Sequence, residues 1–335
     1  MRTTPGNFGR CGRRNYAYFH QKKVRTQTVE KLTCRYPLVG MSLRCSLFGF
    51  SRQAWYAAIK QKEKVSFEFD AVLAEILAIR KRIPGIGTAK LYELLKPFLS
   101  SHFIKMGRDK IHYLLKKEGL LVKKKGHRVV TTNSDHCLKK YPNLVKDIIP
   151  TETEVLWVSD MTYLSCGRGF AYLSLIMDAF SRKIVGWSIQ KKLDAKGPVL
   201  ALKMALKSRT KATQLIHHSD RGVQYCSWAY VDLLRDANVE ISMCSSAEPN
   251  ENSMAECLNC TLKEDFNVKG FISFCEASEV IERVIKTYND YRPHASLDYR
   301  TPKQAHQSIG SQRLRWYPYK KIRFSNVIRK PVNTA

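Results

Sequence analysis

The stretch Trp157-Val158-Ser159-Asp160-Met161-Thr162-Tyr163-Leu164 decides the fold of this chain. It is rich in the β-branched, aromatic and bulky residues that suit a pleated, buried surface, so we predict a strand over 154–164. One carboxylate, that of Asp160, lies in the middle of this strand. Because a buried carboxylate is costly unless a cation compensates its charge, we expect Asp160 to face a cation.

The segments that follow predict a sheet built around this strand. Two short strands are expected at 170–178 and 183–189, and the short turns between them favour an antiparallel meander. Helices over 194–208 and 224–237 then alternate with strands over 213–218 and 239–243, and helices over 253–268 and 275–290 follow. This order indicates an α/β fold with a mixed sheet flanked by helices.

The region before the sheet has a helical and basic pattern. One helix is expected to begin at Ser51, a second at Asp70 that ends at Pro84-Gly85, a third over 88–95 and a fourth at Asp109. Together they predict a small helical domain with helix-turn-helix character. Its basic residues either contact DNA or lie on solvated helix faces; they are Arg80, Lys81, Arg82, Lys90, Arg108 and Lys110.

Charge and turn residues divide the chain into five expected parts. Residues 1–41 are either a basic arm without helical or strand period or the product of a misassigned start, with translation beginning at Met41. Residues 42–125 form the helical region, 126–150 a basic linker and 151–310 the sheet domain. The tail, 311–335, interleaves basic and aromatic residues, which is typical of nucleic-acid contact but also of a strand packed on the domain.

Composition narrows the class of protein. The chain has 335 residues, 44% of them hydrophobic, which is enough for two or three domains with real cores. Its net charge of +28 favours a polyanionic partner, nucleic acid above all, over a basic protein without such a partner. Ten scattered cysteines without a signal segment indicate reduced thiols and a cytoplasmic protein. No window approaches the roughly 18 apolar residues that span a bilayer, so no membrane partner is expected.

Three acids are the candidates for chemistry. Asp160 lies in the first strand, Asp220 follows a short apolar strand, and Glu256 lies in a helix that Asn252 or Ser253 can cap. Each taken alone could be a turn or surface residue. If the three converge, they repel one another, and a divalent cation removes that repulsion. Oxygen ligands favour Mg²⁺ or Mn²⁺ over Zn²⁺, and two such ions about 3.5–4 Å apart can support phosphoryl transfer.

Four further motifs follow Trp157–Leu164 in order: DAFSRKIVGW at 178–187, HHSDRGVQY at 217–225, ENSMAE at 251–256 with LKE at 262–264, and YNDYRPHASL at 288–297. Over 42–310 the chain resembles the second-reading-frame product of bacterial insertion-sequence transposases with a DDE integrase core, in the insertion-sequence-three family. The resemblance implies a ribonuclease H-like fold, with Asp160, Asp220 and Glu256 as the metal-binding catalytic triad. It also implies cleavage at the element ends and strand transfer into target DNA.

The same resemblance implies further site residues and partners. Arg221, Gln224, Asn252 and Lys263 lie beside the triad and could contact the DNA strand. Arg292 and His294 of the closing motif could contact phosphate, although the proline between them also suits a structural turn. The implied partners are double-stranded DNA of the element ends and target, further copies of this chain, and a first-frame protein of the same element. We expect a nucleoid-associated protein of the bacterial cytoplasm.

Two other functions stay open. One is a ribonuclease H-like nuclease that only hydrolyses; the helical region and basic tail count against it. The other is a catalytically inactive DNA-binding remnant. The intact triad counts against this remnant, but the 244–250 loop counts for it. Ala247 stands where relatives have Gly, and the aromatic residue expected near Asn250 is missing.

Several other side chains invite a functional role that we do not favour. Cys257 and Cys260 are one helical turn apart, but zinc needs four ligands and no second pair is suitably spaced. His217 and His218 lie in a buried strand, where adjacent residues point to opposite faces and a satisfied core histidine is expected. Asp178 is expected to pair with Arg182 or Lys183.

Overall fold

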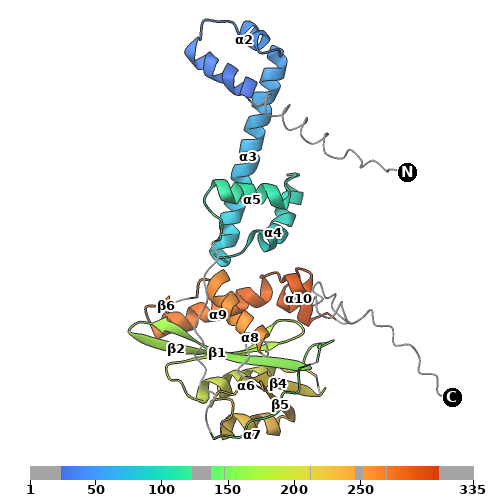
Figure 1. Cartoon of the computed structure of the whole chain (residues 1–335), viewed down its shortest axis with the longest axis vertical. Coiled ribbons are helices and arrows are strands. Elements are labelled where there is room, and N and C mark those ends of the chain that lie inside the picture. Colours follow the sequence, from blue (N-terminus) through green and yellow to red (C-terminus); the bar gives the residue numbers. More distant parts are fainter. Residues whose placement is uncertain are drawn as a thin grey trace, which may run out of the picture. The chain divides into compact units, whose positions relative to one another are not determined.

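A computed structural model describes residues 24–122, 137–146, 148–211, 213–245, 252–268 and 270–308. The chain divides into two compact units, Met1–Ala74 and Glu75–Ala335, and helix α3 (Arg52–Arg82) contributes to both (Figure 1). The basic tail after 308, the arm before residue 24, most of the predicted linker and the loop 246–251 lie outside the described residues. What the sequence predicts for them stays a prediction.

The first unit is a small helical cluster. Residues 24–35 are helical, α2 covers Met41–Leu47, and the start of α3 completes the cluster. Val29, Cys45 and Trp55 are its buried centre. The prediction that residues 1–40 have no helical period is therefore wrong for 24–35, because a few long-range contacts, not an apolar repeat, bury this helix.

Helix α3 runs unbroken from Arg52 to Arg82, so the two separate helices predicted at Ser51 and Asp70 are one. Asp70 lies exposed in its interior and caps nothing. The sequence between these positions contains neither Gly nor Pro, and an interior Asp costs a helix only a fraction of a kcal/mol, about 0.7 at most. Asp70 is a residue type that often caps helices, and it therefore predicted a helix start at a position where α3 continues without a break.

The second unit begins with a helix pair. Helix α4 covers Thr88–Ser101 and α5 covers Arg108–Lys117, and the two pack through Leu91, Leu95, Ile111 and Leu115. The end of α3 joins them, since Arg80 donates to the carbonyl of Leu120 at 2.6 Å. The third and fourth predicted helices are confirmed, the third extending six residues further.

The rest of this unit is built on a mixed sheet in the order β3-β2-β1-β4-β5. Strands β1 (Leu156–Cys166), β2 (Gly169–Asp178) and β3 (Ile184–Gln190) pair antiparallel. Strands β4 (Leu215–Ser219) and β5 (Val239–Met243) continue from β1 in parallel, and β6 (Gly270–Phe271) pairs with the end of β1. The predicted meander and mixed sheet are confirmed, with β1 at the centre.

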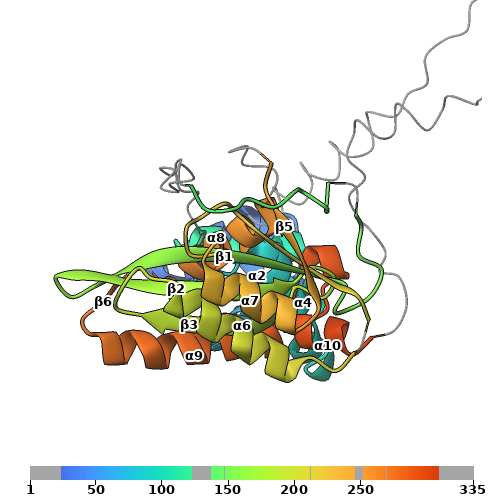
Figure 2. The ribbon, with the colours of Figure 1, turned by 90° about the horizontal axis from the view of Figure 1, so that it is seen from below.

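Helices cover both faces of the sheet (Figures 1 and 2). Helices α6 (Lys196–Ser208) and α7 (Trp228–Asp236) lie on one face, and α8 (Ser253–Asp265) and α9 (Phe274–Asp290) on the other. The short helices η1 (Ala295–Leu297) and α10 (Pro302–His306) follow α9. No helix in the described part of the chain is both long and apolar enough to cross a membrane.

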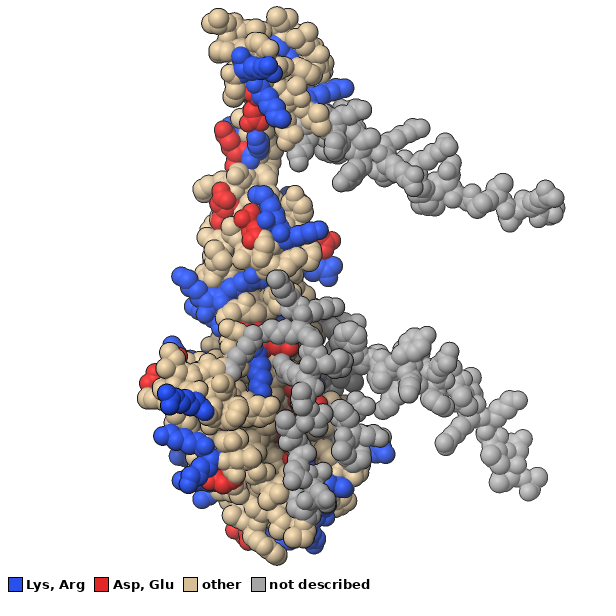
Figure 3. All heavy atoms as spheres, turned by 60° about the vertical axis from the view of Figure 1, so that its left-hand side comes forward, with Lys and Arg blue, Asp and Glu red and all other residues tan. Residues whose placement is uncertain are grey.

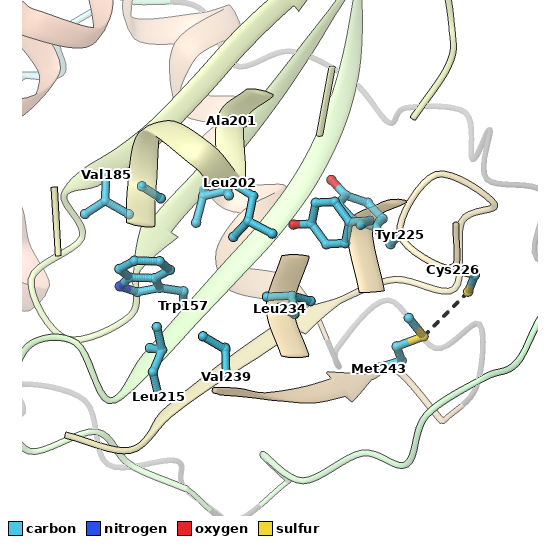
Figure 4. Packing of buried hydrophobic residues seen from close by; sticks show 13 residues of the cluster. Trp157, Val185, Ala201, Leu202, Leu215, Tyr225, Cys226, Leu234, Val239 and Met243 are labelled. Carbon is cyan, nitrogen blue, oxygen red and sulfur yellow. Dashed lines mark hydrogen bonds between the residues drawn. The ribbon is translucent and has the colours of Figure 1, made fainter. Parts of the chain in front are cut away.

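Alternation along β1 sends its side chains to both layers. Trp157 is fully buried beneath α6 and α7 and packs in one cluster with Val185, Leu202 and Leu215 (Figure 4). Ser159, two residues on, reaches the same side, where its hydroxyl donates to the Tyr225 hydroxyl at 3.0 Å. Asp160, the residue after Ser159, points to the opposite face, where Asn259 of α8 contacts it.

The contact between β3 and α6 depends on a glycine. A Cβ atom at Gly186 would lie 2.2 Å from the carbonyl oxygen of Ala201 in α6. We expect Gly186→Ala to lower the free energy of unfolding by about 2–3 kcal/mol, because the backbone itself would have to move. The check is urea unfolding beside Gly169→Ala, which meets no atom within 4 Å and should change stability little. Equal effects would show that α6 does not rest on this strand.

Candidate active site

The sheet brings Asp160 and Asp220 together. Strands β1 and β4 are parallel, with Trp157 beside His217 and Val158 beside His218. Continuing this register by two residues places Asp220, which follows β4, next to Asp160. Neighbouring strands are about 4.8 Å apart, so the two carboxylates leave adjacent backbone positions. Asp220 is fixed by a turn in which its Oδ1 accepts the Gly222 N–H at 3.0 Å.

Helix α8 presents Glu256 to the same strand. Three residues of α8 and its N-cap contact β1: Asn252 donates to the Ser159 carbonyl at 3.0 Å, Asn259 to Asp160 Oδ2 at 2.6 Å, and Lys263 to the Thr162 hydroxyl. Glu256 lies between Asn252 and Asn259 at helical spacing, so it shares their face. The three predicted acids therefore lie around one position beside the middle of β1.

These acids interact electrostatically. Burial raises the pKa of Asp160 to about 7, and the Asp220 carboxylate beside it adds to the rise. Hydrogen bonds from the Met161 N–H and from Asn259 oppose this change, and Glu256 adds a smaller repulsion. The pKa of Glu256 is raised by burial and then by Asp220. A cluster of acids that disfavours its own ionisation is the usual setting for a cation.

The donor set fits a hard divalent cation in chemistry, though the side chains are not closed around one. All three predicted ligands are carboxylates, which suits Mg²⁺ or Mn²⁺. Within the described ranges, no three His, Cys, Asp or Glu side chains are arranged to hold a metal ion. Asp160 uses one oxygen for Asn259 and the other for the Met161 N–H at 2.9 Å.

The structure places the other predicted residues in two groups. Arg221 and Gln224 are half-buried in the turn after Asp220, and Lys263 is half-buried with its ammonium 5.2 Å from the Tyr163 ring centroid. Lys263 lies on the face of α8 that carries Glu256. Asn252 is only 6% exposed and its amide nitrogen is used for β1. It connects α8 to the strand, and its buried side chain offers little surface for a DNA contact.

Arg292 is buried and His294 is half-buried, and the two side chains contact each other within the fold. Arg292 is 3% exposed, and its guanidinium donates twice to Asp265 Oδ2, at 2.6 and 2.9 Å. Its remaining terminal nitrogen faces the His294 ring at 2.7 Å. A guanidinium in this position has no surface to offer a DNA phosphate. The closing motif thus fastens α8 to the segment after α9, as the proline between the two residues suggested.

The structural role of Arg292 can be tested with the variant Arg292→Met. Leaving Asp265 without its buried partner should lower the free energy of unfolding by about 3 kcal/mol. The salt dependence of DNA binding should stay as in the wild type, because no phosphate contact is lost. The matched control is Arg283→Met on the exposed face of α9, which should be near neutral in both measurements. A flatter salt dependence with unchanged stability would restore Arg292 to the DNA contacts.

Two basic residues of the helical region are not free either. Lys90 is half-buried and pairs with Asp265 Oδ2 at 3.4 Å, and Arg80 donates to a backbone carbonyl. Burial lowers the pKa of both side chains. The side chains of Arg108 and Lys110 at the start of α5 remain exposed, and they border a hollow of about 570 Å³ that also contacts Tyr92 and Tyr299.

The remaining polar residues are structural. Asp178 is fully buried, but its oxygens accept from the N–H groups of Glu154 and Ser181 and from the Ser181 hydroxyl, so the expected ion pair with Arg182 or Lys183 is wrong. His217 bonds the Tyr230 hydroxyl at 2.9 Å and His218 the Ser242 hydroxyl at 2.8 Å, which confirms them as core histidines. Burial lowers the pKa of His217 to about 3.

One residue of the site escaped the sequence analysis. Asn259 is 7% exposed and holds Asp160 through its amide nitrogen. The signal was present in the helical spacing of positions 252, 256, 259 and 263, which all fall on one face of α8. A polar residue on a helix face that must pack against a strand is unusual unless it serves another polar group.

Residues 150–249 and 237–302 match models of the integrase core domain. The chain is 32% identical to the insertion element IS600 uncharacterized 31 kDa protein of Shigella sonnei, over 77% of this chain and 95% of that protein. It is 30% identical to the transposase for insertion sequence element IS629 of Shigella sonnei, over 63% of this chain and 73% of that protein.

Two further similarities cover different lengths. The transposase InsF for insertion sequence IS3A of Escherichia coli is 26% identical, over 82% of this chain and 96% of that protein. Among solved structures, the HTLV-2 integrase catalytic core domain in complex with magnesium aligns with 47% of this chain and 98% of that chain, at 18% identity and a TM-score of 0.34.

Proposed function

Because the chain belongs to the transposases of bacterial insertion sequences, we propose that Asp160, Asp220 and Glu256 hold the divalent ions with which it cuts and joins DNA. The protein is a DDE-type transposase, a polynucleotidyl transferase, and its mixed sheet is the ribonuclease H-like core of that class. The observation that carries the proposed site is the register of β1 and β4, which sets two aspartates side by side opposite the face of α8 that bears Glu256.

We infer that the ions are Mg²⁺ or Mn²⁺ and that two are bound. When bound, such ions activate a water or a DNA 3′-hydroxyl and neutralise charge on the phosphoryl group in an in-line displacement. The three carboxylates would be their ligands. Asn259, already bonded to Asp160, would orient that carboxylate, because groups that hold a metal ligand in place are themselves hydrogen-bonded.

The DNA is expected to lie along β1 and α8. Lys263 lies beside Thr162 on the strand of Asp160, which supports its contact with a phosphate near the scissile bond, and Arg221 and Gln224 follow Asp220 in the turn. Positive charge exceeds negative on the face of the molecule in Figure 3, in keeping with the net charge of +28. We assign the helical region 42–125 to binding of DNA, with Arg108 and Lys110 as its exposed contacts.

The partners follow from the reaction. An element has two ends that must be joined to one target, so we expect a homo-oligomer on double-stranded DNA of both kinds. A first-frame protein of the same element would add recognition of the ends. Because its proposed substrate is DNA, we expect the protein to act at the bacterial nucleoid.

The test is strand transfer in vitro with labelled DNA of the element's terminal repeats, an unlabelled target duplex and Mn²⁺, against the same reaction with EDTA. A joined product that needs the metal supports the transposase. Cleavage without joining would favour a hydrolytic nuclease, and DNA binding without either product would favour an inactive remnant. The altered sequence of the 244–250 loop is the reason to test for an inactive remnant.

A further inference from the structure

The last residues of α8 interact unfavourably with the dipole of their own helix. The helix ends with Glu264 and Asp265, two acids at the negative end of the helix dipole. Its last carbonyl groups also lack partners within the helix. Left to itself this end of α8 would fray, so its order depends on donors and cations from elsewhere.

Two cations reach Asp265 from different parts of the chain. Arg292, after α9, donates to Asp265 Oδ2 at 2.6 and 2.9 Å. Lys90, in α4 of the helical region, pairs with the same oxygen at 3.4 Å. The Arg292 side chain is buried, whereas the Lys90 side chain is 27% exposed and can be changed without leaving an empty space in the interior.

A backbone contact completes the arrangement. The Gly85 N–H, in the turn between α3 and α4, donates to the Asp265 carbonyl at 2.7 Å and so serves one of the carbonyls that α8 leaves open. A Cβ atom at Gly85 would lie 2.2 Å from the Glu264 carbonyl oxygen, so only glycine allows this approach. Ile83 and Ile86 on either side of the turn are fully buried, which fixes its position.

We propose that Gly85 and Lys90 are positioning residues for the transposase reaction, which cap the end of α8 and so hold its Glu256 and Lys263 against β1. The proposal rests on the function proposed above. Gly85 and Lys90 lie outside the integrase core match, which begins at residue 150. We call the contacts of Gly85 and Lys90 with Asp265 the joint. Besides binding DNA, the helical region would position α8, and with it Glu256, through this joint.

The distances make such an effect reasonable. Glu256 precedes Asp265 by nine residues, about 14 Å along a helix. A tilt of α8 about its N-cap contact with Ser159 would carry Glu256 and Asn259 away from Asp160. Displacements of about 1 Å at reacting groups can cost on the order of 100-fold in rate. Binding of DNA by the helical region should need no such alignment and should survive loss of the joint.

The experiment compares full-length wild type with Lys90→Gln, Gly85→Ala, Lys90→Arg and Lys96→Gln. Lys96 is the matched control, since it lies in α4 and its ammonium contacts Glu93 at 2.6 Å and the Tyr92 ring, both in the same helix. Hydrogen exchange of peptides covering 253–265 is measured with and without a terminal-repeat duplex, in EDTA. Strand transfer with Mn²⁺ is then followed at saturating and limiting DNA.

We expect faster exchange in 253–265 for Lys90→Gln and Gly85→Ala, with near-normal rates for Lys90→Arg and Lys96→Gln. The maximal strand-transfer rate should fall about 10- to 100-fold in the first two, while the DNA concentration for half-saturation changes by about twofold or less. Wild-type exchange and rate in Lys90→Gln would overturn the proposal. So would a loss confined to DNA affinity, which would make Lys90 a phosphate contact.

Failure of this proposal can be told from failure of the proposed function. The exchange measurement needs neither metal nor catalysis, so it reports on the joint even in a protein that transfers no strand. An inactive wild type with normal exchange differences among the variants would reject the catalytic assignment and keep the joint. Gly85→Ala and Lys90→Gln perturb the joint in different ways, so a folding defect in one still leaves the other as the test.

Discussion

Strand transfer by Glu256→Gln is expected to fall by more than about 10³-fold, while DNA binding and fold stay close to those of the wild type. The substitution keeps the size of the side chain and removes only its charge. Glu256 is exposed on the β1-facing side of α8 and is not needed for packing. The product is measured with labelled terminal-repeat DNA and Mn²⁺, and binding with the same duplex in EDTA.

The control for this variant is Glu282→Gln, an equally conservative change on the exposed face of α9. It should transfer strands at the wild-type rate. Equal product from Glu256→Gln and wild type would remove Glu256 from the site, and the register of β1 and β4 would then support a pair of aspartates with some other third ligand.

Asp160→Asn is expected to abolish strand transfer to a similar degree and at the same time to stabilise the metal-free protein. The loss of activity follows from removing a proposed metal ligand. The gain in stability follows because burial and the neighbouring Asp220 make an ionised Asp160 unfavourable in the fold. A residue kept at the expense of stability is typical of a functional site.

The stability gain depends on pH in a defined direction. Folding raises the pKa of Asp160 from 3.8 to about 7, so the folded state disfavours the charged form. The loss of folding free energy caused by ionised Asp160 is absent below the unfolded pKa. It grows as pH rises from about 4 to 7 and is constant above pH 7. Since Asp160 keeps some contact with water, we expect a gain on the order of 2 kcal/mol at pH 8 rather than that of the full shift.

Thermal unfolding in EDTA at pH 4 and pH 8 checks this prediction. The matched control is Asp178→Asn, at the end of the neighbouring strand. Its carboxylate accepts two N–H groups and a hydroxyl, so its loss should destabilise the protein. Added Mn²⁺ should raise the wild-type melting temperature at pH 8 and leave Asp160→Asn unchanged. A less stable Asp160→Asn would mean that Asp160 is a structural residue like Asp178.

The sheet domain could be predicted closely because its signals are local. Apolar runs such as 170–178 and 239–243 are bounded by turns and have strand length, and the amphipathic helices that follow have a clear period. The helical region was less predictable. Asp70 has the chemistry of a cap but lies within α3, and 24–35 folds because Val29 is buried by residues distant in sequence.

The residues of the candidate site also differ in how far the sequence could identify them. Asp160 could be identified as a candidate because it is a charged residue within an apolar strand. Asp220 and Glu256 could be identified from their motifs. The roles of their neighbours were not identifiable. Arg292 looked like a phosphate contact in the sequence, and only the fold shows that it is buried on Asp265. Asn259 carried no motif, yet it is the side chain that holds Asp160.

The sequence by itself determined which segments become strands and helices, which charges have no place in a core, and which family the chain resembles. These depend on a residue and its near neighbours along the chain. The tertiary structure alone decided the partners: Asp160 beside Asp220, Asn259 on Asp160, Gly85 and Lys90 on the end of α8. The physical reason is that hydrogen bonds and ion pairs form between distant positions, such as Gly85 and Asp265, 180 residues apart. Their meeting is fixed by sheet register and helix packing rather than by local pattern.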